Sequence, residues 1–123
     1  MPKPAPPRPT PLLVACLCAD WCGTCRTYRT LFDQLTAQFA DVYFVWVDVE
    51  YESDLVDPIE VEDFPTILIA SPQKALFFGT VLPHIQTVQR LIEMHQTGAT
   101  QALPREEDVN ELVRRLWQRV PQV

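Results

Sequence analysis

The sequence predicts an α/β fold, in which a central mixed sheet of about four strands is flanked by helices. An apolar run, an amphipathic stretch and a second apolar run follow one another over residues 12–49, which is the order of a right-handed parallel crossover. Two further strand-like runs, at 66–70 and 74–81, are separated by the turn Ser71-Pro72-Gln73. Two amphipathic stretches complete the chain and are expected to be helices.

The first strand is expected over 12–18, because this apolar run lies between Pro11 and Asp20 and is typical of a strand buried on both faces. A helix is expected to follow Cys22 and to end near Ala40. Its apolar positions recur at spacings of three and four, at Tyr28, Leu31, Phe32, Leu35 and Phe39. The second strand is expected over 42–49, where β-branched and aromatic residues are frequent.

The elements after residue 49 are marked by caps and by periodicity. Ser53 or Asp54 can cap a short helix within the acidic stretch 50–63. Pro83 favours the start of a helix that ends before Gly98. The last helix is expected over 105–120, with acidic residues at its start and arginines at its end. Its apolar stripe consists of Val109, Leu112, Val113, Leu116, Trp117 and Val120.

The length of 123 residues fits one compact domain. Six of the twelve prolines fall within residues 1–11, which we expect to be an extended, proline-rich arm, either disordered or docked on a partner. We expect residues 12–96 to form the domain and 97–123 to form a helical extension that packs on it. The alternative is that the extension binds a partner or forms a homodimer; a monomer is our expectation.

The charge distribution excludes several partners. The formal net charge is −6, and eight of the sixteen carboxylates lie between Asp48 and Asp63 without a Lys or Arg among them. The eight arginines and two lysines are scattered, so no basic surface for nucleic acid is expected. The low pI disfavours an anionic membrane surface, and the apolar runs are too short to span a bilayer. The first residues lack the apolar core of a secretory signal, so we expect a cytoplasmic protein.

Four cysteines lie within ten residues, at Cys16, Cys18, Cys22 and Cys25. Such crowding does not resemble a disulfide scaffold and indicates cysteine chemistry at one place. Cys22 is expected at a helix start, where free N–H groups and the helix dipole favour a thiolate. Cys25 is one turn further on and can displace a disulfide formed at Cys22. The alternative is a metal site, in which all four thiols bind zinc or an iron–sulfur cluster.

Residues 19–26 read Ala-Asp-Trp-Cys-Gly-Thr-Cys-Arg, which closely resembles the thioredoxin active-site segment Ala-Glu-Trp-Cys-Gly-Pro-Cys-Lys. Phe64-Pro65-Thr66 opens a strand in the manner of the thioredoxin cis-proline loop. The sequence over about 12–95 is therefore similar to the thioredoxin superfamily. The resemblance implies a thioredoxin-like fold with an added C-terminal helix. It also implies a thiol-disulfide oxidoreductase that contributes to cell redox homeostasis, with a redox-active Cys22–Cys25 disulfide and no other cofactor.

The resemblance assigns roles to individual residues. Cys22 would be the nucleophile and Cys25 the resolving thiol, with protein disulfides as substrates and a dithiol or a reductase as electron donor. The residues expected to bind substrate are Trp21, Gly23, Thr24, Phe64, Pro65 and Gly79. In this family the residue before the cis-proline offers its backbone to the substrate, so Phe64 takes that role. Asp20 and Asp63 are expected to modulate the site, as is Cys16.

The sequence departs from the family pattern around the resolving thiol. Cys16 stands where thioredoxins usually have a buried Asp, and Trp46 stands at the position of the partner lysine. Proton transfer at Cys25 must then use water or another group such as Asp63. Cys16 and Cys18 should point to one face of their strand. They are either buried as small apolar residues, or Cys16 lies near Cys25 and forms an alternative disulfide or a redox sensor.

Two further departures bear on function. The strand and helix that precede the catalytic strand in thioredoxins have no counterpart before Leu12, so helix 105–120 is the expected cover of one sheet face. The acidic run ends at Glu62-Asp63, beside the proposed substrate loop. It is either a solvated surface or a segment that repels acidic substrates and favours basic ones. The alternative function is a non-enzymatic thioredoxin-fold adaptor or redox sensor that binds a partner protein.

Overall fold

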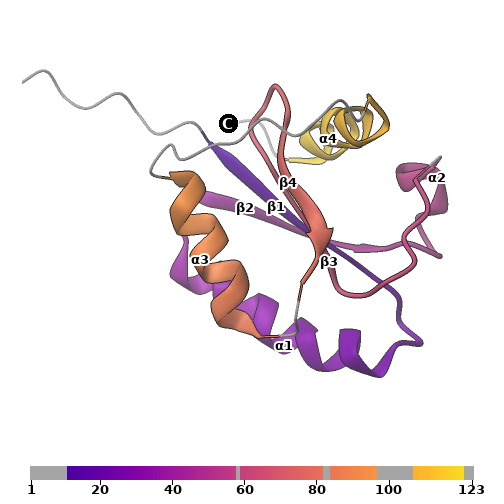
Figure 1. Cartoon of the computed structure of the whole chain (residues 1–123), viewed down its shortest axis with the longest axis horizontal. Coiled ribbons are helices and arrows are strands. Elements are labelled where there is room, and N and C mark those ends of the chain that lie inside the picture. Colours follow the sequence, from indigo (N-terminus) through magenta and orange to yellow (C-terminus); the bar gives the residue numbers. More distant parts are fainter. Residues whose placement is uncertain (1–10, 58, 82–83, 97–106, 121–123) are drawn as a thin grey trace, which may run out of the picture.

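The computed structural model describes residues 11–57, 59–81, 84–96 and 107–120. Within them the α/β class predicted from the sequence is confirmed (Figure 1). The elements are β1 (Leu12–Cys18), α1 (Gly23–Gln38), β2 (Val42–Asp48), α2 (Ser53–Val56), β3 (Thr66–Ala70), β4 (Ala75–Thr80), α3 (Ile85–Gln96) and α4 (Glu107–Arg119). Residues 1–10 of the expected arm, and the expected helix-boundary residues Pro83 and Gly98, lie outside the described residues.

The strands form a mixed sheet with the order β2-β1-β3-β4. β1 pairs in parallel with β2 and antiparallel with β3, and β3 pairs antiparallel with β4. All seven residues of β1 are buried, as its continuous apolar run predicts. The central position of β1 places the loop after Cys18, and hence the start of α1, at one edge of the sheet.

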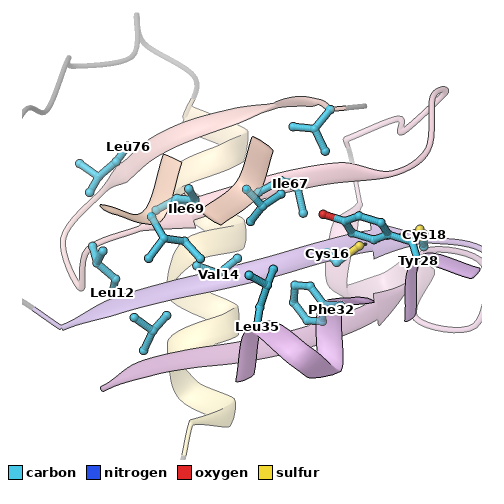
Figure 2. Packing of buried hydrophobic residues seen from close by; sticks show 14 of the residues in the cluster. Leu12, Val14, Cys16, Cys18, Tyr28, Phe32, Leu35, Ile67, Ile69 and Leu76 are labelled. Atoms are coloured by element: carbon cyan, nitrogen blue, oxygen red, sulfur yellow. Dashed lines mark hydrogen bonds between the residues drawn. The ribbon is translucent and has the colours of Figure 1, made fainter. Parts of the chain in front are cut away.

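Alternate residues of β1 pack into two layers (Figure 2). Val14, Cys16 and Cys18 face the layer formed by α1 and α3, whereas Leu13, Ala15 and Leu17 face α2 and α4. Figure 1 shows α1 and α3 on one side of the sheet and α4 on the other. Both faces of the central strand are therefore covered by helices, and two of the four cysteines lie beneath α1.

Helix α4 packs on the sheet face opposite to α1 through its apolar stripe. The buried members of this stripe are Val109, Leu112, Val113 and Leu116. Trp117 Nε1 donates to the Ser71 carbonyl at 2.9 Å, and Asn110 Oδ1 accepts from the Ala75 N–H at 3.1 Å. These bonds attach α4 to both ends of the β3–β4 turn. The division of the chain into an arm over 1–11, a domain over 12–96 and an extension over 97–123 stays a prediction.

Several element ends differ from those predicted by one or two residues, and hydrogen bonds account for two of these differences. The first helix ends at Gln38, before Ala40, and the Phe39 N–H closes it by donating to the Leu35 carbonyl at 3.1 Å. The second strand ends at Asp48, because the Asp48 carboxylate accepts the N–H groups of Glu50 and Tyr51, both at 3.0 Å, and the chain turns there. Side-chain acceptance of backbone N–H groups competes with strand pairing.

Candidate active site

The loop between β1 and α1 places Cys22 at the first turn of the helix. The Cys22 N–H donates to the Ala19 carbonyl at 3.0 Å, and the Cys22 carbonyl accepts from the Arg26 N–H at 3.1 Å. Cys22 is thus the N-cap residue of α1, and its side chain makes no capping hydrogen bond. Its thiol is free and partly exposed. The free N–H groups at the start of α1 and the positive end of the helix dipole lie at this position.

Cys25 lies one turn into α1 and is bonded to Cys18, not to Cys22. The Cα atoms of Cys18 and Cys25 are 5.8 Å apart, and the two residues are 0% and 1% exposed. The expected Cys22–Cys25 disulfide is therefore not the one that the structure contains. The physical reason is that the inner side of the first turn of α1 packs over the end of β1, where Cys18 is the last residue.

Cys16 is a buried free thiol beside this disulfide. Its Sγ donates to Cys18 Sγ at 3.9 Å. Burial raises the pKa of the Cys16 thiol, and the positive charge of Arg29 offsets only part of this effect. The hypothesis that Cys16 forms the alternative disulfide with Cys25 was wrong, because Cys18 holds that position. Cys16 stays a neutral thiol and cannot provide the negative charge of a buried aspartate.

Two aromatic residues border the buried cysteines. Trp46 is opposite Cys16 in the β1–β2 register, and the Arg29 guanidinium lies 4.9 Å from the centre of its ring. Tyr28 is completely buried near Cys16 and Cys18, and its hydroxyl has no hydrogen-bond partner among the described residues (Figure 2). Burial, followed by the nearby Cys16, raises the pKa of this hydroxyl. The sequence analysis identified Tyr28 only as one apolar position of the helix. The helical spacing of apolar residues carries no information about the hydroxyl of a tyrosine.

Asp48 fixes the loop that precedes the cysteine pair, a role that the sequence analysis missed. Its Oδ2 accepts the Asp20 N–H at 3.2 Å, while its Oδ1 accepts two further backbone N–H groups. The bond from Tyr51 is the first cause of a lowered pKa of the Asp48 carboxyl. The Asp20 carbonyl accepts from Arg26 at 3.0 Å, so Asp20 acts through its backbone. One feature of the sequence indicated this role of Asp48: parallel strands end at the same edge of a sheet, which places the end of the second strand beside the loop after the first.

The loop containing Pro65 comes to the same edge as the cysteines. The Phe64–Pro65 peptide bond is cis, and the Pro65 carbonyl accepts the Val81 N–H at 3.1 Å. The rings of Phe64 and Trp21 meet edge to face, with their centres 5.7 Å apart. Trp21 is nevertheless 61% exposed. The structure thus brings together two residues that are far apart in the sequence and that were both expected to contact substrate.

Two grooves lie beside these residues. The first, of about 210 Å³, is lined by Glu60, Val61, Glu62, Asp63, Thr66, Phe78, Gly79 and Thr80. A Cβ on Gly79 would meet the Phe77 ring at 3.6 Å, an ordinary contact, so the fold alone does not require glycine there. The second groove, of about 420 Å³, is lined by Gly23, Thr24, Thr27, Tyr28 and Leu31. Gly23, Thr24 and Asp63 are exposed, and Asp63 belongs to the acidic wall of the first groove.

Comparison with known proteins identifies the family. The family model named thioredoxin matches residues 8–81, which is more than half of the chain and includes both the cysteine pair and Pro65. This chain belongs to the thioredoxin family. Members of the thioredoxin family are thiol-disulfide oxidoreductases that act on protein disulfides.

Individual thioredoxins are similar over part of their length. The H-type thioredoxin of Picea mariana is 34% identical over 58 residues, which are 47% of this chain and 46% of the relative. Human thioredoxin is 34% identical over 55 residues, 45% of this chain and 52% of the relative. The crystal structure of a Nicotiana alata thioredoxin aligns with a TM-score of 0.64 and 27% identity, over 72% of this chain and 76% of that one.

This chain spans about half the length of the curated thioredoxins that it matches. Within its described part, no group of three or more His, Cys, Asp or Glu side chains is arranged to hold a metal ion. A search of the same residues for an apolar helix long enough to cross a bilayer found none.

Proposed function

We propose that this chain is a thiol-disulfide oxidoreductase that exchanges disulfides with proteins through Cys22 and Cys25. The observation that carries the proposal is the state of Cys22. Its thiol is free and partly exposed at the N-cap of α1, three residues before a cysteine whose sulfur is already engaged in a disulfide. A position at a helix N-terminus and access to solvent are typical of reactive cysteines.

The reaction follows from these positions in the reduced chain. The Cys22 thiolate attacks one sulfur of a substrate disulfide, forms a Cys22–substrate bond and releases the other substrate sulfur as a thiolate. The Cys25 thiolate then attacks Cys22, which forms an intramolecular disulfide and releases the second substrate thiolate. Two electrons pass from the cysteine pair to the substrate, and the protons lost by the two thiols are taken up by the products. Because the electrons move between sulfur atoms, no organic cofactor is needed.

We propose that the substrate lies across Trp21 and the loop at Phe64-Pro65. The exposed Trp21 ring offers a flat apolar contact beside Cys22, and Phe64 supports that ring edge to face. The first groove continues from Asp63 to Gly79, and three of its eight lining residues are acidic. An extended, basic segment of a substrate protein fits a wall of this charge better than an acidic one.

We also propose an electron donor, a compartment and an oligomeric state for this chain. A dithiol or a reductase returns electrons to the oxidised chain. A reducing compartment such as the cytoplasm suits a protein with the free thiols Cys16 and Cys22. The burial of the α4 stripe against the sheet accounts for that apolar surface within one copy and supports a monomer.

Trapping tests this function. In Cys25→Ser the second step is blocked, so a Cys22–substrate disulfide should accumulate with insulin and appear as a reducible adduct on a non-reducing gel. The double variant Cys22→Ser/Cys25→Ser is the matched control and should give none. No adduct from Cys25→Ser, together with no insulin reduction by the unmodified chain, would overturn the proposal.

A further inference from the structure

Cys25 has two cysteine neighbours that differ in exposure, Cys22 on the outside and Cys18 inside. We propose that Cys18 is a third redox cysteine, which takes over the bond to Cys25 after Cys22 and Cys25 have been oxidised. This inference rests on the proposed function, because Cys22–Cys25 is the disulfide that would be passed inward. In the structure the transfer is complete: Cys18 is bonded to Cys25 and Cys22 is free.

The placement of the three residues allows the exchange. Cys18 ends β1, Cys22 caps α1 and Cys25 lies in the first turn of α1, so a four-residue loop folds Cys25 back over the strand end. The 5.8 Å between the Cα atoms of Cys18 and Cys25 lies within the usual range for disulfides. Residues three apart in a first helical turn also share a face, so Cys25 lies between two partners.

The exchange balances without an external oxidant. The Cys18 thiolate attacks Cys25 Sγ, the Cys18–Cys25 bond forms and the Cys22–Cys25 bond breaks. Cys22 leaves as a thiolate at the helix N-terminus, where negative charge is stabilised. The proton that Cys18 gives up is replaced by one available to Cys22, so the number of electrons and protons in the chain is unchanged. In the structure the Cys16 thiol donates to Cys18 Sγ at 3.9 Å, so Cys16 lies beside the new bond without taking part in the exchange.

The transfer changes what the oxidised chain can do. With Cys18 and Cys25 at 0% and 1% exposure, a protein reductant cannot approach the new disulfide directly. Electrons must enter through Cys22, which attacks Cys25 and reverses the exchange. Meanwhile Cys22 can capture a substrate disulfide while Cys25 is unable to release it. The chain then holds its substrate until an external thiol attacks the Cys22–substrate disulfide, because Cys22 must be free again before it can open the internal bond.

Peptide mapping of the full chain tests the inference. Cleavage on the N-terminal side of aspartate separates residues 1–19, with Cys16 and Cys18, from residues 20–32, with Cys22 and Cys25. After oxidation with oxidised glutathione, acid quenching and alkylation in denaturant, a Cys18–Cys25 bond links the two peptides. A Cys22–Cys25 bond stays within the second peptide. We expect linked peptides carrying alkylated Cys16 and Cys22 to be the main disulfide product.

Variants identify the cysteine involved. Cys18→Ser should lose the linked product and show the internal Cys22–Cys25 disulfide, whereas the matched control Cys16→Ser should keep the link. A link that survives Cys18→Ser and disappears in Cys16→Ser would overturn the role of Cys18, as would an unmodified chain in which Cys18 is fully alkylated after oxidation.

A parallel insulin assay separates the two proposals. Linked peptides without insulin reduction would leave the role of Cys18 standing as a disulfide partner and overturn the proposed enzyme. Insulin reduction with only the internal Cys22–Cys25 product would overturn the role of Cys18 and leave the proposed enzyme standing.

Discussion

The backbone N–H of Asp20 donates a hydrogen bond to Oδ2 of Asp48 at 3.2 Å, across the ends of the parallel strands β1 and β2. Asp48 also accepts the N–H groups of Glu50 and Tyr51. One carboxylate therefore holds both the loop that leads to Cys22 and the turn that follows β2. The position of the reactive cysteine depends on a residue that carries no sulfur chemistry itself.

Asp48→Ala should lower the free energy of unfolding by about 1–3 kcal/mol, because backbone N–H groups lose a charged acceptor. Urea unfolding at pH 7 measures this loss, and Asp41→Ala, an exposed residue before β2, should change it by less than about 0.5 kcal/mol. An unchanged unfolding midpoint in Asp48→Ala would contradict the anchoring role.

The lowered pKa of Asp48 predicts that the stability of the fold depends on pH. The folded pKa of Asp48 lies below its unfolded value of about 3.9, so its contribution to stability is present above that value. It is lost as the pH falls through the folded pKa. The stability difference between the unmodified chain and Asp48→Asn should therefore be constant near neutral pH and shrink below about pH 4. A stability difference that grows on acidification would contradict a folded pKa of Asp48 below the unfolded one.

Trp21→Ala should reduce exchange with protein disulfides more than exchange with a small disulfide. An aromatic contact of this kind contributes about 0.5–1.5 kcal/mol, which corresponds to a fall of roughly 2- to 12-fold in kcat/KM for insulin. Tyr43→Ala is the matched control, since Tyr43 is a partly exposed aromatic near the start of β2, at the other end of the strand from Asp48. Equal losses with insulin and with cystine would argue against a substrate contact at Trp21.

Glu62→Gln/Asp63→Asn should reduce the preference for basic over acidic peptide disulfides, by about 3- to 10-fold at low salt and less at high salt. The ratio of kcat/KM for two peptides of opposite charge measures the preference. Asp33→Asn/Glu93→Gln removes the same charge from exposed positions of α1 and α3 and should leave the ratio unchanged. If both double variants shift the ratio equally, the preference for basic peptides arises from net charge and not from the groove.

Leu116→Ala should destabilise the fold by about 2–5 kcal/mol, because Leu116 is fully buried in the layer between α4 and the sheet. Guanidinium unfolding provides the measurement, and the exposed Gln118→Ala should stay within about 0.5 kcal/mol. A chain truncated after Gln96 should be destabilised further. If the truncated chain is as stable as the full one, α4 does not serve as a cover.

Periodicity and motif together predicted most of the fold, but not the sulfur pairing. The run 12–18, the spacing from Tyr28 to Phe39 and the turn at Ser71-Pro72-Gln73 each correspond to an observed element, because local pattern determines which face is buried. The disulfide of Cys18 depends on how the loop after β1 folds back, and sequence spacing favours the nearer Cys22. Asp48 was likewise counted only as acidic surface, because its backbone partners are brought to it by the turn.

Fast exchange with protein disulfides at Cys22 distinguishes an enzyme from a sensor that only reports oxidation. Single-turnover oxidation of the reduced chain by insulin, followed through tryptophan fluorescence, tests it most directly. We expect a second-order rate constant well above that of dithiothreitol, and no reaction in Cys22→Ser. A rate no higher than that of dithiothreitol, or one that Cys22→Ser leaves unchanged, would contradict it.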